Sequence, residues 1–278
     1  MSEPAPRSLV FATDLDTLPL DRVVERRDDH LVVRSPGTPS HYWGNFLLFD
    51  DAPARGDAPR WEARFDEAFG GQPLIRHRAF AWDRTDGEAG AAADEFVVRG
   101  YDLDRSVGLV ARAGAVRPHA RENRDVVVRA LDPDGDRELW DAVVELQVAG
   151  RDAGHAETSY REFVRARLAD RRALFRGGRG SWYVALDPGT SAVTASCGIV
   201  VVEGRGRYQV VDTALAYRRR GIGSRLLVEA ARHATATFRA DRFVIVADRG
   251  YHALALYESL GFEPVEDVCG VCLWPRNG

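Results

Sequence analysis

The chain has 278 residues, of which 45% are hydrophobic and 29% charged, and its formal net charge is −4 at pH 7. This balance is typical of a globular protein with a real core, in one large domain or two of ordinary size. No apolar run is long enough for a transmembrane helix, and the acidic balance argues against a nucleic-acid partner. The N-terminus lacks the basic and apolar blocks of a signal peptide, so we expect a cytoplasmic protein.

Every basic residue other than histidine is an arginine. A phosphate-binding loop of the Walker type needs a lysine, so this class of nucleotide-binding protein is excluded. The same bias is typical of GC-rich coding sequences and indicates a bacterial source.

The N-terminal half contains four segments typical of strands, which are 31–34, 43–49, 74–82 and 96–103. A helix is predicted over 61–69, because bulky apolar residues recur there at helical spacing: Trp61, Phe65, Ala68 and Phe69. The charged stretch 113–125, which contains Pro118, predicts a linker between two halves.

The C-terminal half alternates between strand-like and helix-like segments. Strands are expected at 126–131, 181–186, 195–202, 207–213 and 242–247. Helices are expected at 136–147, 159–168, 223–237 and 253–260. Ser159 and Glu162 have the spacing of a capping box, and Gly261 follows the last helix where a left-handed cap is wanted.

The three cysteines give no sign of a metal centre. Cys269 and Cys272 form a lone CxxC, whereas a structural zinc site needs four ligands. The surrounding segment reads as a strand, in which side chains three residues apart point to opposite faces. No two histidines have ligand spacing beside a carboxylate, so we predict no metal.

One stretch carries a chemical signal: residues 216–227 read AYRRRGIGSRLL, between an expected strand and an expected helix. The first turn of a helix leaves peptide N–H groups unpaired, and the helix dipole adds partial positive charge there. Gly221 and Gly223 would let an anion approach those amides, and three arginines (218–220) add donors suited to phosphate. The pattern favours a pyrophosphate-binding loop, although an Arg-rich helix start is often only solvated surface.

Residues 126–275 resemble the GNAT superfamily of acyl-CoA-dependent N-acyltransferases. The first signature is Arg218, Gly221 and Gly223, and the second is the helix with Leu256-Tyr257 followed by Leu260-Gly261-Phe262. The resemblance implies an α/β (α+β) fold whose mixed, mostly antiparallel sheet is flanked by helices and splays open between its fourth and fifth strands. A second, smaller α/β half of similar type would precede it.

The resemblance also implies roles for residues of the site. The pyrophosphate of acetyl-CoA would be held mainly by main-chain N–H groups of Arg218, Arg219, Arg220, Gly221, Ile222, Gly223 and Ser224. The pantetheine arm would pair with the backbone of Val211, Asp212 and Thr213, and one of those amides would polarise the thioester carbonyl. Tyr257 would protonate the departing thiolate, although it also fits a half-buried core aromatic.

The expected organisation is therefore a degenerate GNAT-like or cap domain over 1–120, without a cofactor motif, and a GNAT acetyltransferase domain over 126–278. The predicted reaction is direct acetyl transfer from acetyl-CoA, the cosubstrate, to a primary amine in a ternary complex. The alternative is a non-catalytic acyl-CoA-binding sensor. Four points stay open: the acceptor, the general base, whether the N-terminal half binds a ligand, and the oligomeric state, for which a homodimer is possible. We expect no membrane partner.

Overall fold

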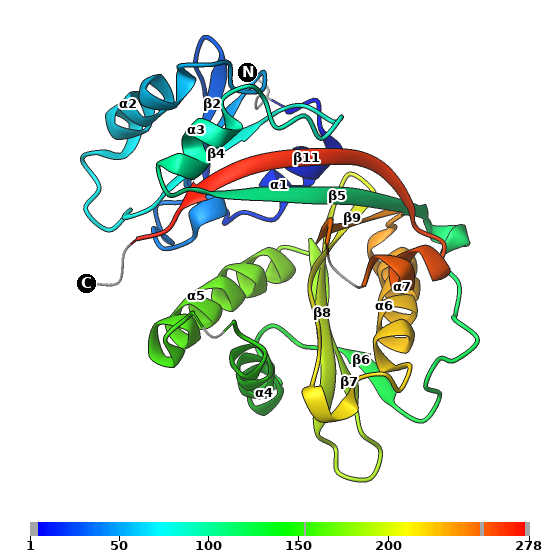
Figure 1. Cartoon of the computed structure of the whole chain (residues 1–278). Coiled ribbons are helices and arrows are strands. Elements are labelled where there is room, and N and C mark those ends of the chain that lie inside the picture. Colours follow the sequence, from blue (N-terminus) through cyan, green and yellow to red (C-terminus); the bar gives the residue numbers. More distant parts are fainter. Residues whose placement is uncertain (1–4, 153, 251–252, 276–278) are drawn as a thin grey trace. The chain divides into compact units, whose positions relative to one another are not determined.

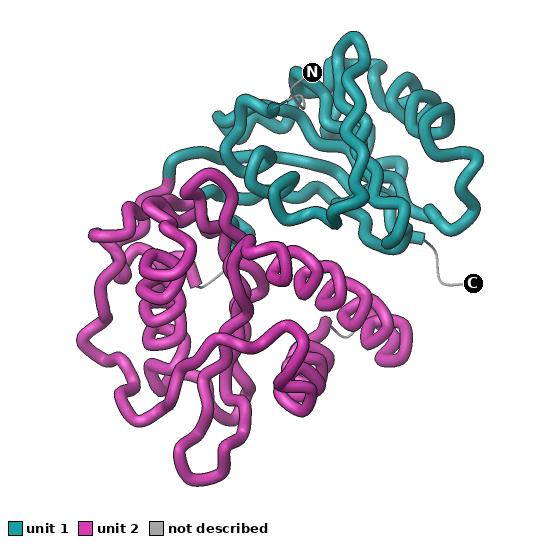
Figure 2. The backbone as a smooth tube through the Cα atoms, turned by 180° about the vertical axis from the view of Figure 1, so that it is seen from behind, with its two compact units in different colours: residues 1–108, 246–251, 265–278 teal, residues 109–245, 252–264 magenta. Residues whose placement is uncertain are grey.

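The structure is a computed structural model, and it describes residues 5–152, 154–250 and 253–275. The chain forms two compact units, shown in Figure 2: unit 1 spans 1–108, 246–251 and 265–278, and unit 2 spans 109–245 and 252–264. The units interleave along the chain, whereas the domains expected from the sequence, 1–120 and 126–278, follow one another. Three strands, β5, β10 and β11, contain residues of both units.

Unit 1 is built on a mixed sheet with helices on both faces. Its strands are β1 (Val23–Arg26), β2 (His30–Arg34), β3 (Phe46–Phe49), β4 (Arg78–Trp82), most of β11 (Glu263–Leu273) and part of β5 (Asp102–Arg112), in the order β1-β2-β3-β4-β11-β5. Its helices are α1 (Leu9–Asp16), the 3-10 turn η1 (Tyr42–Gly44), α2 (Asp57–Phe69) and α3 (Ala93–Val98). β3 and β4 run parallel, and β1, β2 and β3 pair antiparallel.

Strict alternation along the strands of unit 1 fills a core on each face of the sheet. Phe49 lies on the side of α2 and α3, where its ring stacks on Trp61 at 3.7 Å between centroids. Leu48 lies on the opposite side, with α1. Cys269 belongs to the first core and Cys272 to the second, so the expectation that they point to opposite faces is confirmed.

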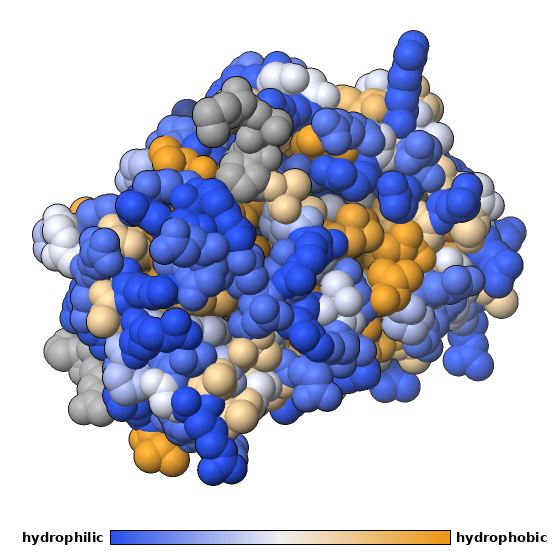
Figure 3. All heavy atoms as spheres, turned by 90° about the horizontal axis from the view of Figure 1, so that it is seen from above, coloured by the Kyte–Doolittle hydropathy of each residue, from blue (hydrophilic) through white to orange (hydrophobic). Residues whose placement is uncertain are grey.

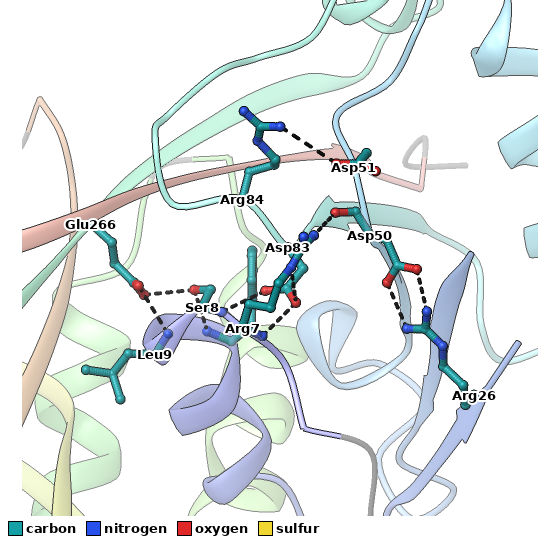
Figure 4. Close-up of polar contacts among 10 residues, drawn as sticks. Arg7, Ser8, Leu9, Arg26, Asp50, Asp51, Asp83, Arg84 and Glu266 are labelled. Carbon is teal, nitrogen blue, oxygen red and sulfur yellow. Dashed lines mark hydrogen bonds and ion pairs between the residues drawn. The ribbon is translucent and has the colours of Figure 1, made fainter. Parts of the chain in front are cut away.

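Two carboxylates from distant parts of unit 1 hold the start of α1 (Figure 4). The peptide N–H of Ser8 donates to Asp83 Oδ1 at 2.8 Å, and the Ser8 hydroxyl donates to Glu266 Oε1, also at 2.8 Å. The Leu9 N–H donates to Glu266 Oε2 at 3.1 Å. Carboxylates at the positive end of a helix satisfy its unpaired N–H groups, so these contacts fix α1 to β4 and β11.

Unit 2 has a five-strand order, β10-β9-β8-β7-β6. Its strands are β6 (Val127–Ala130), β7 (Gly180–Leu186), β8 (Val193–Val202), β9 (Arg205–Thr213) and part of β10 (Arg242–Asp248). Its helices are α4 (Arg137–Ala149), α5 (Glu157–Arg176), α6 (Ile222–Phe238) and α7 (Leu254–Ser259), with the 3-10 turns η2 (Ala113–Ala115) and η3 (Leu215–Tyr217). Figure 1 shows α4 and α5 on one face of β7 and β8 and α6 on the other.

The two units repeat one plan. In each, three antiparallel strands (β1-β2-β3 and β7-β8-β9) lead into a helix (α2 and α6) and then a strand parallel to the third (β4 and β10). A short helix follows in both, α3 and α7. The fold class expected from the sequence, a mixed α/β fold preceded by a second half of similar type, is thereby confirmed.

Two sequence-based expectations about local structure are wrong. Residues 96–98 end helix α3 instead of forming a strand, and Val98 is 88% exposed, so this apolar run does not belong to a sheet. Ser159 does not cap α5, which begins at Glu157 after Ala156; the Ser159 hydroxyl instead donates to the Ala156 carbonyl at 3.1 Å. Helix α1 and strand β1 were not predicted at all, because neither is long or strongly periodic.

The face drawn in Figure 3 is mainly hydrophilic, and its apolar side chains lie in separate areas. Within the described ranges, no helix combines the length and apolar character that crossing a membrane would require.

Candidate functional site

Strand β9 is irregular near its end, at the residues predicted to hold an acyl arm. Ser196 on β8 pairs with Asp212 and Gly198 pairs with Gln209, so Val210 and Val211 together oppose one residue of β8. Val210 has a φ of 42°, which is unusual for a β-branched residue. This is a β-bulge, a feature that often redirects side chains next to functional sites, and nothing in the sequence of the strand indicated it.

On its other side, β9 is only partly paired. In the described residues its parallel register with β10 joins Arg205, Gly206 and Arg207 to Arg242, Phe243 and Val244. This pairing covers the beginning of β9 and, in the described residues, leaves the stretch from Tyr208 onward without a β10 partner. This is the separation of the fourth and fifth strands that the resemblance implied, and it exposes a backbone edge at Val211 to Thr213.

The start of α6 carries the peptide donors expected of an anion site. Gly221 is the N-cap, with φ of 73°, and no side chain caps the helix. The first intrahelical bond runs from the Arg225 N–H to the Gly221 carbonyl, at 3.2 Å. The N–H groups of Ile222, Gly223 and Ser224 thus lie in the first turn, where a helix leaves its donors for an external partner.

Gly221 has a second reason to be glycine, which the motif did not suggest. A Cβ at this position would lie 1.9 Å from the Arg121 carbonyl oxygen. The Asn123 N–H also donates to the Gly221 carbonyl at 3.1 Å. The predicted linker therefore packs against the loop and holds its shape, so Gly221 serves the fold whether or not it also serves a ligand.

The three arginines of the loop are exposed, and two of them have partners within the chain. Arg218 Nε donates to the Thr213 carbonyl at 3.1 Å, which ties the loop to the end of β9. The Arg220 guanidinium lies 5.3 Å from the centre of the Tyr217 ring. Arg219 takes φ of 61°. These contacts use only part of each guanidinium, and the remaining donors face solvent beside the α6 N-terminus.

Three elements meet at Gly223. A Cβ added there would lie 3.5 Å from Thr213 Oγ1 on β9 and 4.0 Å from Leu256 Cδ2 on α7. These are ordinary van der Waals distances, so the chain itself does not demand glycine here. The hydroxyl oxygen of the next residue, Ser224, is buried and has no hydrogen-bond partner among the described residues.

Helix α7, whose Leu256 reaches this junction, also carries Tyr257. Tyr257 follows Leu256, is 5% exposed, and its carbonyl accepts from the Phe262 N–H at 3.2 Å. Gly261 has φ of 99° and its N–H donates to Glu258, so the left-handed cap expected after this helix is confirmed. The sequence-predicted residues on β9, α6 and α7 all belong to unit 2, where Thr213, Gly223 and Leu256 lie close to one another.

The side chain of Asp212 points to the α5 side of β9. Burial raises the pKa of Asp212, and the positive charges of Arg167 and Arg218 oppose that rise. Burial lowers the pKa of Arg167, while Tyr160 and Asp212 oppose the fall. From the sequence, the resemblance implied a role for the Asp212 backbone, and the Asp212 carboxylate was expected to be a loop or backbone-capping group rather than a base. The arginine neighbour on α5 was not anticipated.

No cysteine in unit 2 offers a nucleophile. Cys197 is fully buried on β8, and burial raises the pKa of its thiol far above the usual range. Cys269 and Cys272 belong to unit 1. Among the described residues, no three His, Cys, Asp or Glu side chains gather in a way that could hold a metal ion.

Comparison with known proteins agrees with this geometry. Residues 178–264 match the family model described as Acetyltransferase (GNAT) domain. This segment is a GNAT domain. It contains β8, β9, the Arg218–Ser224 loop, α6 and α7. No curated protein sequence matches the chain.

Solved structures show the same fold over nearly the whole chain. A conserved protein of unknown function from Staphylococcus epidermidis aligns with TM-score 0.69 and 14% identity, over 91% of this chain and 94% of that one. A GCN5-related N-acetyltransferase from Kribbella flavida aligns with TM-score 0.64 and 15% identity, over 97% and 95%. A tandem GNAT protein from the clavulanic acid biosynthesis pathway aligns with TM-score 0.56 and 14% identity, over 100% and 91%. The GNAT fold thus accounts for both halves.

Proposed function

We propose that the protein is an N-acetyltransferase that moves acetyl from acetyl-CoA directly to a primary amine. The observation that carries this proposal is the junction at Gly223, where the open edge of β9, the uncapped first turn of α6 and the Tyr257 helix meet. The unpartnered Ser224 hydroxyl and the missing Cβ at Gly223 fit a phosphate group, because both leave room and hydrogen-bonding capacity for an anion.

In this proposal, main-chain N–H groups from Arg218 to Ser224 bind the pyrophosphate, with the arginine side chains of the loop adding charge. The backbone of Val211, Asp212 and Thr213 pairs with the pantetheine arm as an added strand would. An amide of this segment donates to the thioester carbonyl and stabilises the negative charge that develops on its oxygen. The bulge at Val210 supports this role, because it adds a residue to β9 and increases the local twist directly before this segment, while Asp212 and Thr213 remain paired with β8.

Direct transfer follows from the residues present. The neutral amine nitrogen attacks the carbonyl carbon, the carbon–sulfur bond breaks, and Tyr257 gives its phenolic proton to the leaving thiolate. The nitrogen loses one proton to water on becoming an amide, and the Tyr257 phenolate takes one back from water. A covalent acetyl-enzyme would need a nucleophile at the junction, and the buried thiol of Cys197 has its pKa moved away from the reactive thiolate form.

The first test is calorimetric titration of acetyl-CoA into the full chain and into Gly223→Asp. A carboxylate in the first turn favours the helix dipole, and the chain has room for the Cβ, so the variant should fold with unchanged or higher thermal stability. The same charge should repel the pyrophosphate and weaken acetyl-CoA binding by roughly 100-fold. This corresponds to a loss of about 2.8 kcal/mol in binding free energy, since each factor of ten is about 1.4 kcal/mol. Gly71→Asp is the matched control, because a Cβ there meets nothing within 4 Å.

Tyr257→Phe separates an enzyme from an acyl-CoA sensor. For an enzyme, thiol release in the presence of an accepted amine should fall by about 100-fold, the usual size of a lost general acid, while acetyl-CoA affinity is kept. The sensor would be favoured if neither the unaltered chain nor the variant acetylates any amine while both bind acetyl-CoA with the same affinity. Absence of acetyl-CoA binding by the unaltered chain would refute both functions.

A further inference from the structure

A cluster of polar side chains lies between α5 and the β8–β9 face of unit 2. We call it the Arg167 cluster; its members are Gln147, Tyr160, Arg167, Ser196 and Asp212. Asp212 and Ser196 are directly opposed in the antiparallel register, which places their side chains on one face of the sheet. Val200, four residues along β8 from Ser196, is in the core formed with α4 and α5, so this is the face that these helices cover.

Several hydrogen-bonding atoms of the Arg167 cluster are buried without partners in the described part of the chain. They are Arg167 Nε, Gln147 Nε2 and Ser196 Oγ. Arg167 Nη2 donates to Gln147 Oε1 at 2.8 Å, and the Arg167 guanidinium lies 5.0 Å from the Phe163 ring centre. A buried donor without a partner costs about 1–3 kcal/mol, so three such atoms together point to a missing polar group.

The two charged members attract one another without touching. Each moves the pKa of the other toward its charged form, yet no ion pair joins Arg167 and Asp212 in the described residues. Tyr160, two helical turns before Arg167 on α5, is near both, because its pKa responds to both charges. A cation and an anion without an ion pair between them, in the described residues, thus lie in one cluster with unused hydrogen-bonding atoms, on the strand whose backbone would hold the acyl arm.

We propose that the Arg167 cluster binds the acceptor, and that the acceptor is an amine that also carries a carboxylate, with its ammonium end at Asp212 and its carboxylate at Arg167. This inference rests on the proposed acetyl transfer. A zwitterion supplies an anion for Arg167 and a cation for Asp212 at once. A simple alkylamine or a polyamine satisfies Asp212 alone and brings further apolar surface or positive charge toward Arg167, which disfavours it.

Asp212 then has a chemical part in transfer. The Asp212 carboxylate accepts a proton from the ammonium, and the neutral amine attacks the thioester carbon, forming the carbon–nitrogen bond as the carbon–sulfur bond breaks. The thiolate takes its proton from Tyr257. The new amide nitrogen gives up its second proton, which passes through water to the Tyr257 phenolate, and Asp212 loses its proton to water, so one proton is released per transfer. Burial raises the pKa of Asp212 and so makes it a stronger base than a solvated carboxylate.

The test compares matched acceptors with the full chain and acetyl-CoA, following thiol release. The panel pairs α-, β- and γ-amino acids with their carboxamides, which keep the amine and the size but lose the negative charge. We expect at least one amino acid to exceed its carboxamide by about 10-fold or more in kcat/KM, the value of a charge-assisted pair. Arg167→Gln should abolish this ratio mainly through KM, and Arg167→Lys should restore part of it.

Arg165→Gln is the control, because Arg165 is an exposed arginine on the same helix. It should leave the ratio unchanged. Thermal melting of each variant shows that it folds, and calorimetric titration shows that it still binds acetyl-CoA. Transfer to neutral amines but to none of the amino acids, or an acid-to-amide ratio that survives Arg167→Gln, overturns the inference and leaves the proposed function standing. Loss of acetyl-CoA binding in the unaltered chain overturns both.

Discussion

Asp104 on β5 carries a carboxyl group whose surroundings disfavour its charge. Burial raises its pKa to about 6, and the neighbouring carboxylates of Asp102 and Asp248 add to the rise. The folded chain therefore holds this proton more tightly than the unfolded chain, in which an aspartate titrates near 4. The contribution of Asp104 to stability is complete below about pH 4 and falls as the pH rises to about 6.

We predict that Asp104→Asn removes this loss of stability with rising pH. The difference in thermal midpoint between Asp104→Asn and the unaltered chain should grow from pH 4 to pH 6 and then stay constant, with the variant more stable at neutral pH. Asp102→Asn should reduce the pH dependence of the thermal midpoint only in part, because it removes one neighbouring charge while the Asp104 carboxyl group stays buried. If the thermal midpoints of Asp104→Asn and the unaltered chain differ by the same amount at every pH in this range, the prediction is wrong and the Asp104 carboxyl group is solvated like that of an ordinary aspartate.

At the scale of elements, α2 and α6 begin alike and differ in what surrounds the beginning. Gly56 caps α2 with φ of 84°, and Gly221 caps α6 with φ of 73°. A Cβ at Gly56 would meet nothing within 4 Å, whereas at Gly221 it would lie 1.9 Å from the Arg121 carbonyl oxygen. The two positions therefore separate the cost of a left-handed backbone from the cost of a collision.

We predict that Gly56→Ala lowers the free energy of unfolding by about 1 kcal/mol, the backbone cost alone. Gly221→Ala should lower it by roughly 3 kcal/mol or more, because the linker must also move. Chemical denaturation of both variants measures the difference. Equal effects would mean that the linker does not pack on the α6 loop, and a smaller effect at Gly221 would contradict the close approach of Arg121.

Elements with strong local signals were predictable from the sequence, and those defined by packing were not. The helix at Ile222–Phe238 and the cap at Gly261 follow from periodicity and from one glycine. The apolar run at 96–98 has the composition of a strand, yet it is helical, because Phe96 alone turns inward and packs with the α2 core. Short apolar segments do not distinguish the two structures without knowledge of their neighbours.

The site was predictable where a family motif marks it and hidden where it depends on pairing. The Arg218–Ser224 loop and the helix that carries Tyr257 belong to one unit, in which Gly223 lies near Leu256; the roles that the resemblance implies for them stay predictions. The bulge at Val210 and the position of Arg167 opposite Asp212 depend on the register of β8 with β9 and on the rotation of α5. Neither leaves a local pattern in the sequence, so only the structure shows the polar side of the site.

At the scale of the molecule, two halves with one plan raise the question of how many acetyl-CoA molecules a chain would bind under the proposed function. In unit 1 the place that corresponds to the α6 loop is the start of α2. There the Gly56 N–H already donates to both carboxylate oxygens of Glu95, each at 3.1 Å. Asp57 occupies the first turn and accepts from the Ala54 N–H at 2.9 Å. The chain's own carboxylates thus take the donors and the charge that a pyrophosphate would need.

We therefore predict one acetyl-CoA per chain, bound in unit 2. Calorimetric titration of the full chain should give a stoichiometry of about one, and Gly223→Asp should remove that binding without uncovering a second, weaker phase, because unit 1 presents carboxylates where unit 2 presents arginines. Glu95→Gln should not create an acetyl-CoA site in unit 1, since the carboxylate of Asp57 remains in the first turn of α2. A stoichiometry near two, or binding that persists in Gly223→Asp and is lost on substitution at Gly56, would place a working site in the first half and make the repeat functional as well as structural.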